Sequence, residues 1–150
     1  NGFAKWMTYS VTGAQTWVID TQYGNPGNCA KISGYSGSNN VNEDWLITKP
    51  INLTGVTAAK LTFQSARNYS GNNLVVYMST NYDGVSAPST ATWTTLTATL
   101  STTGFAWTNS GAIDINAAAG QANVRIAFKY TSTSTASATY EIDNVKITEL

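Results

Sequence analysis

The sequence of 150 residues contains no histidine and a single cysteine, Cys29. The lack of histidine removes the commonest general base, the Ser-His-Asp and Cys-His arrangements of nucleophilic catalysis, and zinc or iron held by histidine. One cysteine cannot form an internal disulfide bond. Cys29 begins the strand-like run Cys29 to Ser33, where a buried and inert thiol is the favoured interpretation.

Charged residues are also scarce, because eight Lys and Arg balance eight Asp and Glu, and the formal net charge is zero. A neutral domain with two arginines is poorly suited to the phosphate contacts that dominate nucleic-acid binding. It offers no electrostatic attraction to an anionic membrane. We therefore expect no nucleic acid and no membrane as a partner, and neither a signal peptide nor a membrane span within these residues.

Helical periodicity is almost absent, whereas Thr, Ser, Asn and Gly are abundant and accompany five tryptophans and eight tyrosines. Short runs of β-branched and aromatic residues are closed by Gly, Pro and Asn clusters, which is typical of an all-β sandwich. The pattern predicts strands over residues 3–9, 15–20, 29–33, 43–48, 58–67, 74–80, 92–100, 112–115, 123–130 and 138–150. One helical turn is expected at 117–119.

The last predicted strand contains a slip in its alternation. Tyr140 and Ile142 alternate with polar residues, and so do the apolar residues from Val145 onward, but the two series are out of phase by one residue at Asp143-Asn144. A one-residue slip in a strong strand indicates a β-bulge, which re-aims side chains. The re-aimed carboxylate and amide are hard oxygen ligands that suit calcium. The alternative interpretation is a kink with two solvated polar groups.

Glu141 and Asp143 are the one carboxylate pair with a spacing that suggests catalysis. Two apart on a regular strand, they would share a face at about 6.5–7 Å, within the range of inverting glycosidase pairs. Catalytic pairs, however, normally come from different strands that face each other across a cleft. We therefore expect no enzymatic activity.

Several aromatic residues fall in Gly, Asn and Ser-rich segments outside the predicted strand cores. A sugar site needs aromatic faces for the apolar side of the ring and hydrogen-bonding groups for its hydroxyls. The candidate carbohydrate-binding residues are Tyr69, Arg67, Trp107, Tyr35 and Tyr23. For the loop tyrosines and Trp107, burial in the sandwich remains the alternative. The other tryptophans are interpreted as sandwich core: Trp6, Trp17, Trp45 and Trp93.

A set of short motifs in a fixed order resembles one known family over nearly the whole chain. They are EDWLITKPINLT (43–54), LTFQSA (61–66), VYMSTNYDG (76–84), WTTL (93–96), IAFKY (126–130) and EIDNVKI (141–147). The chain is similar to the choice-of-anchor J and cleaved adhesin domains, relatives of the MAM domains. This resemblance implies a two-sheet antiparallel jelly roll that serves as an accessory module in large secreted bacterial proteins.

The resemblance also implies a structural calcium ion. The aspartate of the family's I-D-N-V strand, a usual ligand, corresponds to Asp143, and Glu43 and Asp44 are further candidate metal ligands. No sugar-contacting motif of the related carbohydrate-binding jelly rolls matches a fixed position of this sequence.

These observations together predict that residues 1–150 form one β-sandwich binding module, excised from a larger secreted protein and monomeric in itself. We expect it to bind a polysaccharide or oligosaccharide without catalysis and to target a parent enzyme, at the bacterial cell surface or outside the cell. The alternative is an adhesin-type module that binds a host or cell-surface protein.

Overall fold

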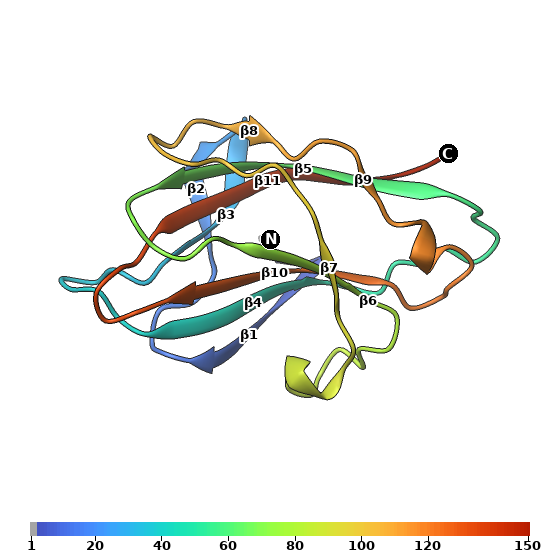
Figure 1. The fold of residues 1–150 in the computed structure, drawn as a ribbon, viewed down its shortest axis with the longest axis horizontal. Helices are drawn as coiled ribbons and strands as arrows, with labels where there is room; N and C mark the ends of the chain where they lie inside the picture. The colour runs from blue at the N-terminus through green and yellow to red at the C-terminus, as the bar shows by residue number, and fades with distance from the viewer. Residues whose placement is uncertain (1–2) are drawn as a thin grey trace.

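The computed structural model describes residues 3–150, which form two antiparallel sheets packed face to face, as the sequence predicts. Figure 1 shows them as two layers, with β11 and β5 in the upper layer and β4 and β10 in the lower one. The five-stranded sheet has the order β1 (Trp6–Thr12), β4 (Asn42–Thr48), β10 (Arg125–Ser132), β6 (Val75–Ser79), β7 (Thr94–Leu96). The six-stranded sheet has the order β2 (Val18–Gly24), β3 (Gly27–Ser33), β11 (Thr139–Glu149), β5 (Ala59–Asn68), β8 (Thr108–Asn109), and β9 (Ile113–Asp114) also pairs with β5.

The main core lies between the sheets, where side chains from alternate positions of facing strands meet. Phe63 of β5 packs edge-on against Phe128 of β10, with ring centroids 5.0 Å apart. Tyr140 and Ile142 of β11 point into the same core, which also contains Trp17. Because successive side chains of a strand face opposite ways, the residues between these point to the outer faces.

The strand predictions agree with the structure for most elements, with four differences. β1 and β2 lie three to four residues further along the chain than predicted, which places Tyr23 at the end of a strand rather than in a loop. The strand expected at 92–100 is reduced to β7, because the chain then leaves the sheet edge. The short strand β8 was not predicted, since two residues carry no alternation. The helical turn lies at Asn116–Ala118, and a second one lies at Pro88–Thr90.

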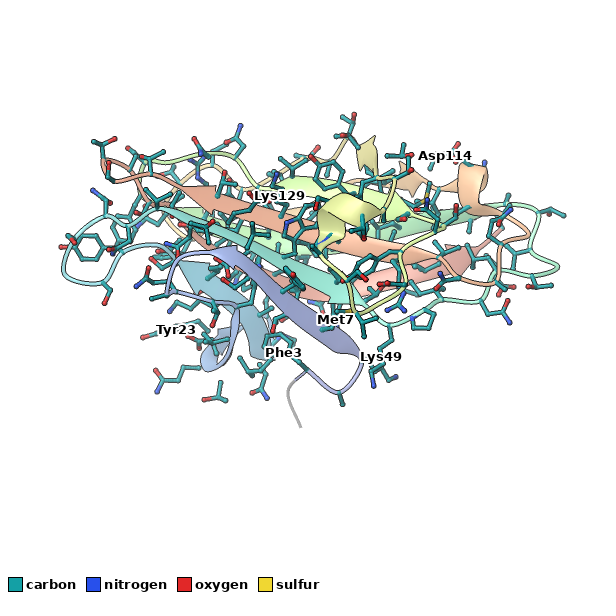
Figure 2. All side chains as sticks on the ribbon, turned by 90° about the horizontal axis from the view of Figure 1, so that it is seen from below. Phe3, Met7, Tyr23, Lys49, Asp114 and Lys129 are labelled. Carbon is teal, nitrogen blue, oxygen red and sulfur yellow. The ribbon has the colours of Figure 1, made fainter. Side chains whose placement is uncertain are left out.

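Trp45 and Trp93 do not belong to the core between the sheets, contrary to the prediction. Trp45 points to the outer face of the five-stranded sheet, where it stacks on Tyr77 with ring centroids 5.4 Å apart. Residues 80–93 fold back over this face and bring Trp93 to 5.2 Å from Trp45. The turn at Pro88–Thr90, yellow in Figure 1, lies in this covering segment. Figure 2 views the same face, with Met7 and Lys129 labelled on it.

The predicted β-bulge in the last strand is confirmed. Asp143 pairs with Gln64 and Lys146 pairs with Thr62, so β11 has one more residue than β5 between these pairs. Asn144 takes up the extra length with a left-handed φ of 52°.

The predicted burial of Cys29 is also confirmed, and burial raises the pKa of its thiol to about 12. No helix within residues 3–150 is long and apolar enough to cross a membrane.

Asp44 is an exception to the apolar interior. Its side chain lies on the inward face of β4, only 1% of the residue is exposed, and neither carboxylate oxygen has a hydrogen-bond partner in the described structure. Burial raises the pKa of Asp44 to about 6, and the negative charge of Glu43 adds to this effect. An unpaired buried carboxylate destabilises the folded state when it is ionised.

We expect Asp44→Asn to stabilise the protein above pH 6 and to have little effect below pH 4. The folded-state pKa lies above the unfolded value near 3.9, so the contribution of Asp44 to stability is present at low pH and is lost as the pH rises through about 6. The difference between the folded and unfolded pKa values of Asp44 corresponds to about 2–3 kcal/mol. Urea unfolding of wild type and Asp44→Asn at several pH values measures the difference in their free energies of unfolding. If the Asn variant is less stable than wild type at every pH, this result would contradict the conclusion that the Asp44 carboxylate has no hydrogen-bond partner.

Candidate functional site

The outer face of the six-stranded sheet carries a hollow of about 650 Å³. Glu141 of β11 and Lys31 of β3 lie at its floor, and four aromatic side chains border it. The lining residues are Tyr23, Lys31, Ser33, Tyr69, Phe105, Trp107, Thr139 and Glu141. We call it the charged hollow.

A second hollow of about 450 Å³ adjoins the first and contains no charged residue. It is formed where the loops after β3, β5 and β10 meet at one end of the sandwich, at the left in Figure 1. Its lining residues are Ser33, Tyr35, Asn39, Tyr69, Ser70, Thr135, Ala136, Ser137 and Thr139. We call it the hydroxyl hollow. Because Ser33, Tyr69 and Thr139 line both hollows, the two adjoin, and we refer to them together as the groove.

The β2–β3 hairpin brings Tyr23 to one wall of the groove. Its turn folds over the outer face of the sheet, where the Asn25 N–H donates to Asp143 Oδ2 at 2.6 Å. The amide of Asn144 donates to the Asn25 carbonyl at 2.6 Å, so the bulge holds this turn from both sides. The Lys31 ammonium lies 5.2 Å from the ring centre of Tyr23. The Tyr23 side chain lies at the margin of the molecule in Figure 2.

Two aromatic residues of the opposite wall have left-handed backbones that non-glycine residues rarely adopt. Tyr69 has a φ of 67° and Phe105 a φ of 52°, and their rings meet edge-on with centroids 6.0 Å apart. The Phe105 N–H donates to the carbonyl of Arg67 at 2.8 Å, which ties its loop to the end of β5. Such strained backbones cost on the order of 1–3 kcal/mol each and concentrate at ligand-binding sites.

Lys31 and Glu141, at the floor of the charged hollow, belong to an ion-pair cluster whose third member is Asp20. Lys31 Nζ lies 3.1 Å from Asp20 Oδ2 and 3.8 Å from Glu141 Oε1. The Glu141 residue is 3% exposed. Burial raises the pKa of Glu141, an effect that Lys31 opposes and Asp20 reinforces.

The structure brings four of the five predicted carbohydrate-binding residues to this groove and leaves one outside it. Tyr23, Tyr69 and Trp107 line the charged hollow, and Tyr35 and Tyr69 line the hydroxyl hollow. Arg67 does not line either hollow. The position of Arg67 at a strand end suggested that its guanidinium is free to contact a ligand, but the chain that follows folds back onto this guanidinium.

The Arg67 guanidinium instead holds the loop that carries Tyr69. It donates to the Gly71 carbonyl at 2.7 Å and to Asn73 Oδ1 at 3.1 Å, and it lies 5.4 Å from the ring centre of Tyr140. Gly71 has to be a glycine, because a Cβ there would come within 2.4 Å of the Ala138 nitrogen. Arg67 is therefore a positioning residue for Tyr69.

Sequence reasoning missed the polar floor and Phe105. Glu141 and Lys31 alternate with core residues, which predicts only that they face outward. Nothing local indicates that this outer face is hollowed, since the walls come from loops far away in the sequence. Phe105 follows Gly104 in a segment without alternation.

The three acidic residues predicted to bind calcium do not converge. Asp44 points between the sheets, and Glu43 lies on the outer face of the five-stranded sheet, where Glu43 Oε1 accepts from Trp45 Nε1 at 3.1 Å and lies 3.5 Å from Lys129 Nζ. Asp143 lies in the other sheet and lines a separate hollow of about 320 Å³ with Asn144. Residues 3–150 contain no cluster of three or more His, Cys, Asp or Glu side chains suited to a metal. The three residues do not fit one calcium site, and calcium binding at Asp143 alone stays a prediction.

Comparison with known proteins finds the same fold in solved adhesin domains and carbohydrate-binding modules. The K1 cleaved adhesin domain of Lys-gingipain from Porphyromonas gingivalis W83 is similar, with a TM-score of 0.70, 22% identity, and coverage of 98% of this chain and 92% of that domain. The family 11 carbohydrate-binding module from Clostridium thermocellum, in complex with a β-1,3-1,4-mixed-linked tetrasaccharide, has a TM-score of 0.58, 17% identity and coverage of 99% and 91%. TmCBM61, in complex with β-1,4-galactotriose, has a TM-score of 0.57, 11% identity and coverage of 99% and 91%.

These similarities confirm the predicted jelly-roll sandwich. No match was found among curated proteins. Residues 7–150 match the model of the family described as "Domain of unknown function (DUF5017)". The chain belongs to this family.

Substitution of Asp143 separates its hydrogen-bonding role from calcium binding. Asp143→Ala removes the acceptor of the Asn25 N–H and should lower stability by about 1–2 kcal/mol, whereas Asp143→Asn retains an acceptor and should lose less. Calcium that binds only the folded state raises its melting temperature. The calcium hypothesis therefore predicts that a chelator lowers the melting temperature of wild type but not of either variant.

Thermal melts with and without chelator, measured by circular dichroism, give both results. A wild-type curve that does not respond to chelator would contradict the calcium hypothesis and leave the hairpin contact as the role of Asp143.

Proposed function

We propose that this chain is a non-catalytic carbohydrate-binding module that holds a parent secreted bacterial protein on a polysaccharide. One observation carries the proposal. Within residues 3–150, the aromatic side chains with more than half of their surface exposed are Tyr23 at 57%, Tyr35 at 59% and Tyr69 at 63%, and all three line the same groove. A large ring exposed to water contributes little hydrophobic stabilisation to the fold. Three such rings in one groove therefore favour a binding role.

The groove combines the two kinds of group that a sugar requires. Its rings offer flat apolar faces, and Trp107 and Phe105 add partly buried ones. Between them lie hydroxyl and amide groups such as those of Ser33, Thr139 and Asn39. Aromatic faces with a few placed polar groups are characteristic of small-molecule and oligosaccharide sites.

The chemistry of the groove favours binding without hydrolysis. Among the residues that line it, Glu141 is the one carboxylate. Glycoside hydrolysis normally uses two carboxylates on opposite sides of the scissile bond. A module of this kind raises the local concentration of its parent protein at the polymer, with many weak contacts acting together.

Binding to a panel of polysaccharides tests the function. The single-site affinity should be weak and nearly independent of salt, since the chain has no net charge and releases few counterions. Ala substitution of Tyr23, Tyr35, Tyr69 or Trp107 should cost about 1–3 kcal/mol of binding, by analogy with the stacking of bases on aromatic rings. Pull-down on insoluble polymers and affinity electrophoresis with soluble ones measure this.

The control is Val85→Ala, because Val85 is 78% exposed and lies outside the groove. It should bind like wild type. Retention on no polysaccharide, together with binding to a host matrix protein, would overturn the carbohydrate proposal and support an adhesin module.

Tyr69 offers a matched pair of variants that separates binding from folding. Tyr69→Ala and Tyr69→Asn both remove the ring, but Asn tolerates the left-handed backbone better than Ala does. We expect both to lose binding equally, and the Asn variant to be more stable than the Ala variant by roughly 0.5–1 kcal/mol. Chemical denaturation and affinity electrophoresis on the same samples give the two values. Wild-type affinity in either variant would exclude Tyr69 from the site.

A further inference from the structure

The charges at the floor of the groove do not leave a free cation for a ligand. Of the residues that line the two hollows, Lys31 is the one cation and Glu141 the one anion. Lys31 Nζ also contacts Asp20 Oδ2 at 3.1 Å, so one ammonium faces two carboxylates. Tyr23 lies over the same ammonium. The cluster therefore carries an excess of negative charge when all three groups are ionised.

Glu141 has acceptor capacity that its protein neighbours do not use. Its nearest cation lies at 3.8 Å, beyond hydrogen-bond distance, and the described structure gives its carboxylate no hydrogen bond. The residue is 3% exposed and lines the charged hollow, so little water can reach it from elsewhere. An ionised carboxylate only accepts hydrogen bonds, so a ligand that contacts Glu141 in the hollow has to supply the donor.

The hydroxyl hollow also offers no cation to a ligand. Its polar groups are hydroxyls and amides, and no charged side chain lines it. A ligand carboxylate or sulfate in either hollow would lose its water without gaining a cation, which is unfavourable. In the charged hollow it would also meet Glu141 as a like charge, a contact that costs affinity and excludes wrong partners.

We propose that the groove selects neutral glycans, with a sugar hydroxyl donating to Glu141, and rejects polymers rich in uronic acid or sulfate. This inference rests on the carbohydrate-binding function proposed above. Tyr23 and Trp107 hold the sugar over the charged hollow, and Tyr69 and Tyr35 hold the next sugars over the hydroxyl hollow.

The test compares each neutral polymer with its own acidic derivative. The probes are mixed-linkage β-1,3-1,4-glucan and β-1,4-galactan, together with the same two polymers oxidised at C6 to carboxylates. Affinity electrophoresis at low and high salt should show retention by a neutral polymer, and at least about tenfold weaker retention by its oxidised form.

Two outcomes overturn the inference and are distinguishable from each other. Equal or tighter binding to the oxidised polymer contradicts the selectivity and leaves the binding function intact. Absence of binding to either form of these two polymers, and to any other polysaccharide in the panel, contradicts the function and the selectivity together.

A variant with the two carboxylates removed should bind acidic polymers more tightly than wild type does. In Asp20→Asn/Glu141→Gln, both carboxylates become amides and Lys31 is left as an unpaired ammonium in the hollow. We expect this variant to bind the oxidised polymers about tenfold more tightly than wild type does at low salt, and to lose the gain at high salt.

The matched control adds Lys31→Met to the same two substitutions and should abolish the gain. Circular dichroism melts establish that both variants fold. A folded double variant without any gain would contradict the assignment of Asp20 and Glu141 as the groups that exclude acidic ligands. If the variants do not fold, the comparison of neutral and oxidised polymers on wild type still decides the question.

Discussion

β11 lies between β3 and β5 in the six-stranded sheet, and its side chains alternate between the core and the floor of the groove. Tyr140 and Ile142 are buried between the sheets, which fixes the strand and its register. The same alternation requires Glu141 to face outward beside Lys31. The position of the buried carboxylate is thus set by the hydrophobic burial of its two neighbours.

The walls of the groove depend on polar contacts rather than on hydrophobic burial. The bulge at Asp143 and Asn144 holds the turn next to Tyr23, and Arg67 holds the loop of Tyr69. Tyr69 and Phe105 keep their strained, left-handed backbone conformations because the surrounding contacts hold them there. A site fixed in this way before binding loses less conformational entropy when a ligand arrives.

The sequence predicted what depends on local periodicity. Alternation identified the long strands, and the slip before Val145 identified the bulge. The loop aromatics were recognised one by one as exposed candidates, but their meeting in one groove depends on contacts between segments such as Tyr35 and Tyr69 that are distant in sequence. Such contacts leave no local signal.

Two errors have the same physical origin, because a chain that folds back changes what its residues contact. Trp93 looked like a sandwich-core residue, yet residues 80–93 return over the outer face of the five-stranded sheet and pack it against Trp45. Arg67 looked open at a strand end, yet the following turn places the Gly71 carbonyl on its guanidinium.

The most direct test of the central claim is a map of backbone amide chemical shifts during titration with a soluble neutral oligosaccharide. Xylohexaose, β-1,4-galactotriose and a β-1,3-1,4-linked tetrasaccharide are suitable probes. The account predicts that shifts concentrate at Tyr23, Ser33, Tyr69, Thr139 and Glu141, on strands and loops that are separate in sequence. Shifts that concentrate instead on the outer face of the five-stranded sheet, around Tyr9 and Lys129, would contradict it.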